Sequence, residues 1–180
     1  MSSKAPRPMP DRQVLESLFE YREGCLWWKV KPEGYFKDPA YQRSWNTKFA
    51  GKPAGLHRPD GYVLTMVQGK NVLVHRIIYF LAHGYCPAKV DHVDGNPANN
   101  RIENLRAAND SQNCWNMALS SKNTSGIKGV TWHIRDKRWQ AQLKINDKMV
   151  HLGQFRELED AKAAVINYRK IHHGEFANDG

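Results

Sequence analysis

Residues 89–117, which read KVDHVDGNPANNRIENLRAANDSQNCWNM, constrain the fold of this chain more than any other stretch. Two valines flank a polar pair at 90–93, a composition that predicts a short strand. The dipeptide Asp94-Gly95 then predicts a tight turn. Residues 105–107 predict a second strand, and the Asn-Asp-Ser run at 109–111 supplies preferred N-cap residues for a helix. The predicted order is strand, loop, strand, helix.

Four polar side chains of this stretch suggest a chemical site. Asp91 in the first strand and Asn113 in the helix both offer oxygen, the ligand type that Mg²⁺ and Mn²⁺ prefer. His92 is expected on the opposite side of its strand from Asp91. A neutral imidazole there can take a proton from water, because its pKa is near working pH. Asn104 is expected to hold the long loop, or the imidazole, by hydrogen bonds.

The same stretch resembles the HNH (ββα-metal) endonuclease motif, in the form common in phage homing endonucleases. The resemblance implies His92 as general base, Asp91 and Asn113 as metal ligands and Asn104 as the structural asparagine. It also implies double-stranded DNA as the substrate and a divalent ion, Mg²⁺ or Mn²⁺, as the cofactor. Many relatives have His as the last ligand, so Asn113 follows the homing-endonuclease branch. The matching pieces are Asp91-His92, Asp94-Gly95-Asn96, Asn99-Asn100-Arg101, Asn104-Leu105-Arg106 and Gln112-Asn113.

The charge of the chain fits a polyanionic partner. The 180 residues carry a formal net charge of +9, with 41% hydrophobic and 25% charged residues, as in a folded protein. We expect no membrane partner, because no apolar run approaches the roughly 18 residues of a spanning helix. The three cysteines are never spaced as CxxC, which argues against a zinc knuckle and a disulfide framework. We therefore expect a reducing, intracellular setting, the host cytoplasm if the gene is phage-encoded.

Residues 11–119 are predicted to form the nuclease domain, after a disordered tail at 1–10. Asp11 is a candidate N-cap for a helix whose apolar face includes Val14, Leu15, Leu18 and Phe19, with Gly24 as the stop. A strand is predicted at 25–30. Trp27 and Trp28 within it either pack in the core, the favoured reading, or stack on nucleic acid bases.

The rest of this domain leads into the motif. Residues 31–60 show little periodicity, and their lysines and arginines form either a basic loop that meets phosphate or a solvated loop. Residues 61–67 and 71–75 predict a β-hairpin. A helix is predicted at 76–83, with Gly84 at its end. Arg76 either touches DNA or makes a structural ion pair, and Arg101 in the motif loop is a second candidate DNA contact.

A second module is predicted at 127–180, after a linker at 120–126. Strands at 129–134, 138–145 and 149–152 precede a helix with an apolar stripe. The stripe consists of Ala161, Ala164, Val165, Tyr168 and Ile171. The whole chain is therefore assigned to the α+β class. It combines a ββα-metal motif and its hairpin–helix lead-in with a three-stranded antiparallel sheet packed on one helix.

Residues 123–178 resemble the plant Apetala/ethylene-response-factor DNA-binding domain. The matching pieces are Lys128-Gly129-Val130, Trp139-Gln140-Ala141-Gln142-Leu143, His151-Leu152-Gly153-Gln154-Phe155, Ala161, Ala163-Ala164 and His173-Gly174-Glu175-Phe176-Ala177-Asn178. The resemblance implies DNA contacts from the three strands. The outward candidates are Lys128, Thr131, His133, Arg135, Gln142, Lys144 and His151. Several family arginines are Lys, Thr or His here, so the family's target sequence does not carry over.

These observations favour a metal-dependent DNA endonuclease, of the phage homing type, whose C-terminal sheet supplies recognition. One motif per chain suggests that a monomer nicks one strand, and a double-strand break would need a second copy. The sequence leaves two other functions open. One is a DNA-binding regulator without cutting activity, and the other is an RNA-directed protein that uses Trp27, Trp28 and the basic loop.

Overall fold

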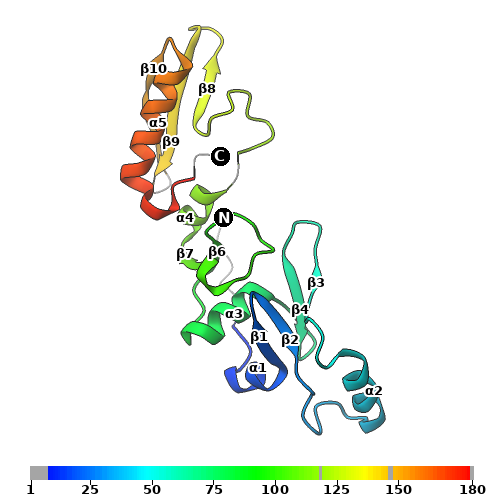
Figure 1. Cartoon of the computed structure of the whole chain (residues 1–180). Helices are drawn as coiled ribbons and strands as arrows, with labels where there is room; N and C mark the ends of the chain where they lie inside the picture. Colours follow the sequence, from blue (N-terminus) through cyan, green and yellow to red (C-terminus); the bar gives the residue numbers. More distant parts are fainter. Residues whose placement is uncertain (1–7, 118, 146–147, 179–180) are drawn as a thin grey trace. The chain divides into compact units, whose positions relative to one another are not determined.

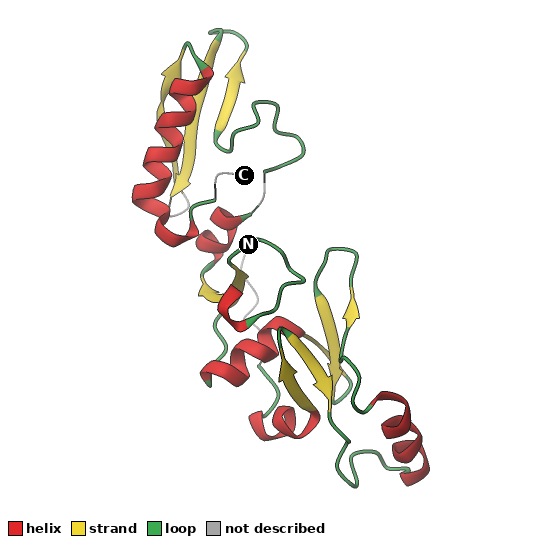
Figure 2. Cartoon of the chain, viewed as in Figure 1, coloured by secondary structure: helices red, strands yellow, loops and turns green. Residues whose placement is uncertain are grey.

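The structure is a computed structural model and describes residues 8–117, 119–145 and 148–178. The chain forms two compact units, residues 1–107 and 108–180, which are described separately. Helices and small antiparallel sheets occur in both (Figures 1 and 2). The mixed α+β class predicted from the sequence is therefore confirmed. Of the tail predicted at 1–10, residues 1–7 lie outside the described residues, and Met9 packs against the N-terminal core.

The N-terminal unit begins with a helix and a hairpin. Helix α1 (Arg12–Leu18) starts at the expected N-cap, because the Asp11 carboxylate accepts the backbone N–H of Gln13 at 2.8 Å. Strands β1 (Phe19–Arg22) and β2 (Cys25–Trp28) follow as an antiparallel pair. The placement of Phe19 in the helix was wrong, and Gly24 is not a helix stop. The two-residue turn at 23–24, with φ of 45° and 85°, folds this segment into a hairpin.

A second small sheet and two helices complete the frame of this unit. Helix α2 (Pro39–Phe49) lies in the stretch without periodicity, after the N-cap Asp38. Strands β3 (Leu56–His57), β4 (Val63–Val67) and β5 (Lys70–Leu73) form an antiparallel sheet. Helix α3 (Val74–His83) ends at Gly84, which has φ of 79° as predicted for a C-cap. His75 belongs to this helix and not to the preceding strand.

The central motif folds as a strand pair. Strand β6 (Lys89–His92) pairs with β7 (Leu105–Ala108), and the short 3₁₀ helix η1 (Ile102–Asn104) closes the loop between them. Val90 and Leu105 join the core of the unit, where α1, α3 and β4 contribute Leu15, Ile77 and Val67, each no more than 1% exposed. The motif strands are therefore anchored in the core by their apolar residues.

The C-terminal unit opens with helix α4 (Asp110–Asn116) and continues into a sheet. Strands β8 (Val130–His133), β9 (Arg138–Ile145) and β10 (Lys148–Phe155) are antiparallel, with β9 in the centre. Helix α5 (Leu158–His173) covers one face, and η2 (Gly174–Phe176) follows it. The predicted three-stranded sheet with one helix is confirmed. Strand β10 continues to Phe155 through a bulge between His151 and Gly153, which the sequence prediction did not foresee.

The buried stripe of α5 differs from the prediction at its C-terminal end. Ala161 and Val165 are fully buried against Val130 and Ala141 of the sheet, as expected. Ile171, however, is 75% exposed. The stripe continues through two polar residues instead, Arg169 and His173, which are 1% and 5% exposed. A hydrogen bond of 2.9 Å from Arg169 to the carbonyl of Lys128 offsets part of the cost of burying the guanidinium.

No helix among the described residues has the length and apolar character needed to cross a membrane.

Candidate nuclease site

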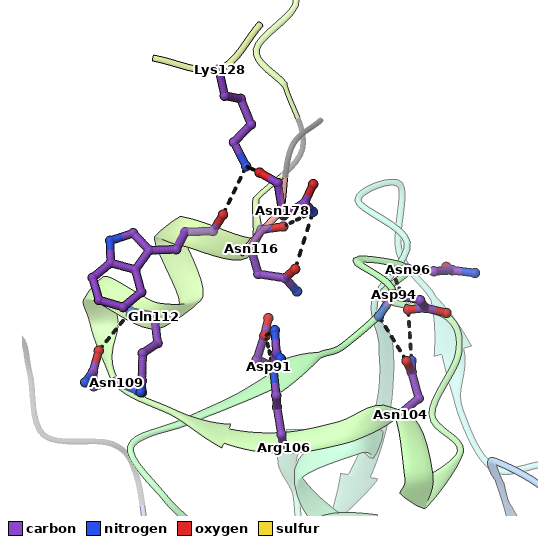
Figure 3. Close-up of polar contacts among 11 residues, drawn as sticks. Asp91, Asp94, Asn96, Asn104, Arg106, Asn109, Gln112, Asn116, Lys128 and Asn178 are labelled. Atoms are coloured by element: carbon purple, nitrogen blue, oxygen red, sulfur yellow. Dashed lines mark hydrogen bonds and ion pairs between the residues drawn. The ribbon is translucent and has the colours of Figure 1, made fainter. Parts of the chain in front are cut away.

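The carboxylate of Asp91 is held by Arg106 on the neighbouring strand β7. Both Nε and Nη2 of Arg106 lie 2.9 Å from Oδ2 of Asp91 (Figure 3). The side chains are 12% and 8% exposed, for Arg106 and Asp91 respectively, so the pair is largely shielded from water. The site therefore contains a buried carboxylate whose charge is balanced by a guanidinium from the paired strand.

His92, the next residue on β6, lies in a group of rings and amides. Its Nε2 is 2.9 Å from Oδ1 of Asn100, which is 3% exposed. The ring centroids of His75 and Tyr62 lie 4.9 and 6.0 Å from that of His92. The side chain of Asn100 therefore holds the imidazole of His92 by a hydrogen bond at Nε2, and the rings of His75 and Tyr62 pack beside it.

His75 is a buried polar residue in the first turn of α3. It is 4% exposed, and its Nδ1 has no hydrogen-bond partner among the described residues. Burial, with smaller contributions from His92 and Arg76, lowers the pKa of His75 from 6.5 to about 3. The imidazole is therefore neutral in the folded protein at physiological pH.

The low pKa of His75 predicts acid sensitivity. The unfolded chain binds a proton at His75 below about pH 6.5, and the folded chain does so only near pH 3. Stability is thus lost as the pH falls through this window. We expect about 2 kcal/mol from this group between pH 7 and pH 5. Urea unfolding, followed through the NMR signals of the α3 amides, measures the loss. His75→Phe should reduce the pH dependence, and the exposed control His57→Phe should not. An unchanged dependence in His75→Phe would contradict the assignment.

Asn104 holds the loop between β6 and β7. Its Nδ2 donates to Oδ1 of Asp94 at 2.9 Å and to the carbonyl of Asn99 at 2.8 Å, and its Oδ1 accepts the N–H of Asp94 at 3.0 Å. Burial raises the pKa of Asp94, but hydrogen bonds from Asn99, Asn96 and Asn104 outweigh it and lower the pKa below its ordinary value. Of the two alternatives left open for Asn104, these bonds support loop holding.

Asn113 lies on α4 in the C-terminal unit, whereas the other three predicted site residues lie in the N-terminal unit. A capping box starts the helix: Asn109 accepts the N–H of Gln112 at 2.8 Å, and the Gln112 side chain accepts the N–H of Asn109 at 2.9 Å (Figure 3). The cap places Asn113 in the first helical turn, as predicted. Met117 lies just beyond the helix rather than within it.

Two predicted DNA contacts donate hydrogen bonds to backbone carbonyls within the protein. Arg76 donates to the carbonyls of Ala88 and Pro87 at 3.1 and 3.2 Å, which ties α3 to the segment that enters β6. Lys128 was expected to point outward, and this was wrong. Its Nζ donates to the carbonyls of Trp115 and Met117 and, as Figure 3 shows, to the carbonyl of Asn178, all within the C-terminal unit. An ammonium held by three carbonyls satisfies its own donors and is poorly placed to meet phosphate.

The other predicted contacts remain on the surface. Arg101 is exposed in the motif loop. Thr131, Lys144 and His151 are exposed on the sheet, and Gln142 is half-buried opposite His151 on β10. In the β8–β9 turn, His133 and Arg135 both contact Asp136, at 3.1 and 3.2 Å.

Sequence reasoning missed Arg106, Asn100 and His75 as parts of the site. Arg106 and Asn100 fall within the sub-motifs Asn104-Leu105-Arg106 and Asn99-Asn100-Arg101. The sequence signal that could have identified these two residues is their polar character beside or within a strand. Their roles, which are contacts with Asp91 and His92, follow only from the way β6 and β7 pair.

Comparison with known proteins identifies a family for the part of the chain that contains these residues. A family model for HNH endonucleases matches residues 72–114, from β5 into α4. Protein 3.8 of Escherichia phage T7 is 35% identical over 105 residues, which cover 57% of this chain and 86% of that protein. An uncharacterized HNH endonuclease of Acanthamoeba polyphaga mimivirus is 40% identical over 122 residues, 66% of this chain and 62% of the relative. No solved structure matches.

These similarities place residues 72–114 in an HNH endonuclease domain. The chain belongs to the same family as protein 3.8 of phage T7. The family match ends at residue 114, so the likeness of residues 123–178 to the ethylene-response-factor domain stays a prediction.

The donor chemistry fits a divalent ion of the Mg²⁺ type. Asp91 offers a carboxylate and Asn113 an amide oxygen, both hard ligands. Among the described residues, no three His, Cys, Asp or Glu side chains form a metal-binding group. In phosphate sites Mg²⁺ commonly binds through one or two carboxylates and keeps water or substrate oxygens as its other ligands.

Proposed function

We propose that this protein is a metal-dependent endonuclease that hydrolyses phosphodiester bonds in double-stranded DNA. One observation carries the proposal: the residues matched by the HNH endonuclease family contain adjacent Asp91 and His92 on a buried strand, each held by a specific partner. A surface polar pair would have neither the burial nor the partners. The viral relative named as an HNH endonuclease supports the same class of reaction.

His92 acts as the general base in this proposal. Asn100 faces Nε2, so Nδ1 takes the proton from the attacking water. Asn104 keeps the loop that carries Asn100 folded against β6. Asp91 and Asn113 would hold Mg²⁺ or Mn²⁺, which when bound stabilises negative charge on the phosphate and on the leaving 3′ oxygen.

DNA recognition is assigned to the outer face of the β8–β9–β10 sheet. Its exposed or half-buried polar residues are Thr131, His133, Gln142, Lys144 and His151. Arg135 in the adjoining turn is 86% exposed, and it adds a cation at the end of this face. A twisted antiparallel sheet of this kind fits the major groove. Arg101 in the nuclease motif is the candidate phosphate contact nearest to the site in sequence.

We also propose that the protein has a homing-type role and acts as a monomer. One HNH motif is present per chain, so a single copy is expected to nick one strand. The two relatives described above are viral, which agrees with a mobile nuclease that works inside a host cell.

Plasmid nicking tests this function directly. We expect supercoiled plasmid to become nicked in Mg²⁺ or Mn²⁺, and nicking to stop in excess EDTA and to return when the metal is restored. A verified monomer that linearises plasmid without a nicked intermediate would contradict the one-strand proposal. Duplex binding without cutting in either metal would favour a DNA-binding regulator instead.

A further inference from the structure

Helix α2 lies outside the core of the N-terminal unit. The chain leaves β2 after Trp28 and returns to it at Lys52, whose carbonyl accepts the N–H of Trp28 at 2.9 Å. The N–H of Ala54 then bonds to the carbonyl of Leu26 at 2.7 Å. Helix α2, between these points, has no buried residue (Figure 1 shows it in blue-green at the edge of this unit). We name residues 29–52 the α2 arm.

The arm is nevertheless held in place, because aromatic rings and the Asn46 side chain pack around Lys31. The Lys31 ammonium lies 3.9–5.0 Å from four ring centroids, which belong to Trp45, Tyr35, Phe36 and Trp28. The backbone of Lys31 exchanges hydrogen bonds with the Asn46 side chain at 2.9 and 3.3 Å. Lys31 is 6% exposed, so these cation–π contacts are largely desolvated and correspondingly strong.

Helix α2 therefore has an inner face toward Lys31 and an outer face toward solvent. The inner face carries the half-buried Gln42, Trp45, Asn46 and Phe49. The outer face is an exposed stripe with helical spacing, and its members are Ala40, Arg43, Ser44, Thr47 and Lys48. Arg43 and Lys48 thus flank the short polar residues Ser44 and Thr47, and these short side chains would allow a partner to approach the helix closely.

The cations of the arm are not neutralised within the protein. Lys37, Arg43, Lys48 and Lys52 are all exposed, and none of them has a carboxylate partner among residues 8–117, 119–145 and 148–178. The segment has two acids: Glu33 is exposed, and Asp38 is the N-cap of α2. A rigid, solvent-facing helix with unpaired cations has an electrostatic surface that complements a phosphate backbone.

We propose that the outer face of α2 binds the phosphate backbone of duplex DNA, as a docking arm separate from both the nuclease motif and the C-terminal sheet. The proposal rests on the function proposed above, because the polyanion that such a chain meets is its DNA substrate. Arg43 and Lys48 would each neutralise a phosphate, and Lys37 and Lys52 would extend the contact at the two ends of the arm. Contacts of this type position the protein on DNA without reading its sequence.

Salt dependence of binding by the full chain tests the arm. The probe is a fluorescein-labelled 30-base-pair duplex without metal, titrated at several KCl concentrations. For Arg43→Ala/Lys48→Ala we expect the slope of log K against log [KCl] to fall by about 2 in magnitude, since two phosphate contacts are lost. At 0.1 M KCl the affinity should fall at least about tenfold. Arg43→Lys, which keeps the charge, should keep the wild-type slope.

A matched pair of cations provides the control. Lys162→Ala/Lys170→Ala removes two lysines from α5 and should leave the slope at the wild-type value. Because Arg43 and Lys48 are exposed, the double variant should fold. The near-UV circular dichroism of the aromatic residues around Lys31 checks this. Lys37→Ala/Lys52→Ala is a second, independent variant that should also lower the slope. Slopes equal to the wild-type value in both arm variants would overturn the proposal.

Failure of the arm and failure of the nuclease assignment are distinguishable. Wild-type protein that neither binds nor cuts duplex DNA would remove the proposed function, and the arm with it. Wild-type protein that binds and nicks DNA, with arm variants that do so at an unchanged slope, would remove only the arm. At saturating DNA the Arg43→Ala/Lys48→Ala variant should nick at the wild-type rate, because its catalytic residues are intact.

Discussion

Replacing His92 by alanine is expected to lower the rate of plasmid nicking by about 10²–10⁴-fold, the usual contribution of a general base. The imidazole of His92 is buried, and its Nε2 is hydrogen-bonded to the side chain of Asn100. Alanine leaves no group that can take the proton from water at this position. The single-turnover nicking rate in Mg²⁺ measures the loss, with the duplex saturating so that binding does not limit the rate.

His57→Ala is the matched control for this experiment. His57 is an exposed histidine on β3 and is expected to be replaced without loss of rate. The duplex affinity of His92→Ala should match that of the wild type, since His92 is assigned to the reaction and not to binding. Nicking that survives in His92→Ala would mean that the base is another residue.

Arg106→Ala is expected to destabilise the N-terminal unit by about 3–5 kcal/mol, the typical cost of leaving one charge of a buried pair without its partner. The Asp91 carboxylate is 8% exposed and receives two nitrogens of the guanidinium at 2.9 Å. Urea unfolding at pH 7 measures the change. The exposed residue Arg101 gives the control, because Arg101→Ala removes the same charge from the surface and should change stability by less than about 0.5 kcal/mol.

The double variant Asp91→Ala/Arg106→Ala separates pairing from packing. It should be more stable than Arg106→Ala alone, because the unbalanced carboxylate is removed as well. Millimolar Mg²⁺ should also recover part of the stability of Arg106→Ala, since an ion bound at Asp91 supplies the missing positive charge. Arg106→Ala with wild-type stability would contradict the buried ion pair. Lack of recovery by Mg²⁺ would argue against Asp91 as a metal ligand.

The aromatic residues of the N-terminal unit illustrate how a sequence pattern leaves alternatives that packing resolves. Trp28 packs on Phe19 at 4.6 Å and edge-on against Trp45 at 5.0 Å, so the favoured core reading is supported for it. Trp27 is half-buried, with the Arg22 guanidinium 5.0 Å from its ring. No sequence window of ordinary length places Phe19, Trp28 and Trp45 together. They meet because a hairpin and the returning segment at 51–54 bring three separate elements to one place.

The sequence by itself determined the order of elements in the motif and which of its side chains are candidates for chemistry. Strand propensity at 90–93, the Asp94-Gly95 turn and the Asn109 cap are local properties, because each depends on neighbours within a few residues. The alternation along β9 is local for the same reason: Ala141 and Leu143 are buried, as the period of two predicted.

Only the tertiary structure decided which partners these residues have. Arg106 meets Asp91 across a strand pair, His75 meets His92 from a helix, and Lys31 is enclosed by rings drawn from β2, the following loop and α2. Helix α2 itself lacks a buried apolar stripe, so the sequence has no hydrophobic periodicity that would predict this helix. Contacts between residues far apart in the chain depend on how the elements pack, and a local pattern does not contain that information.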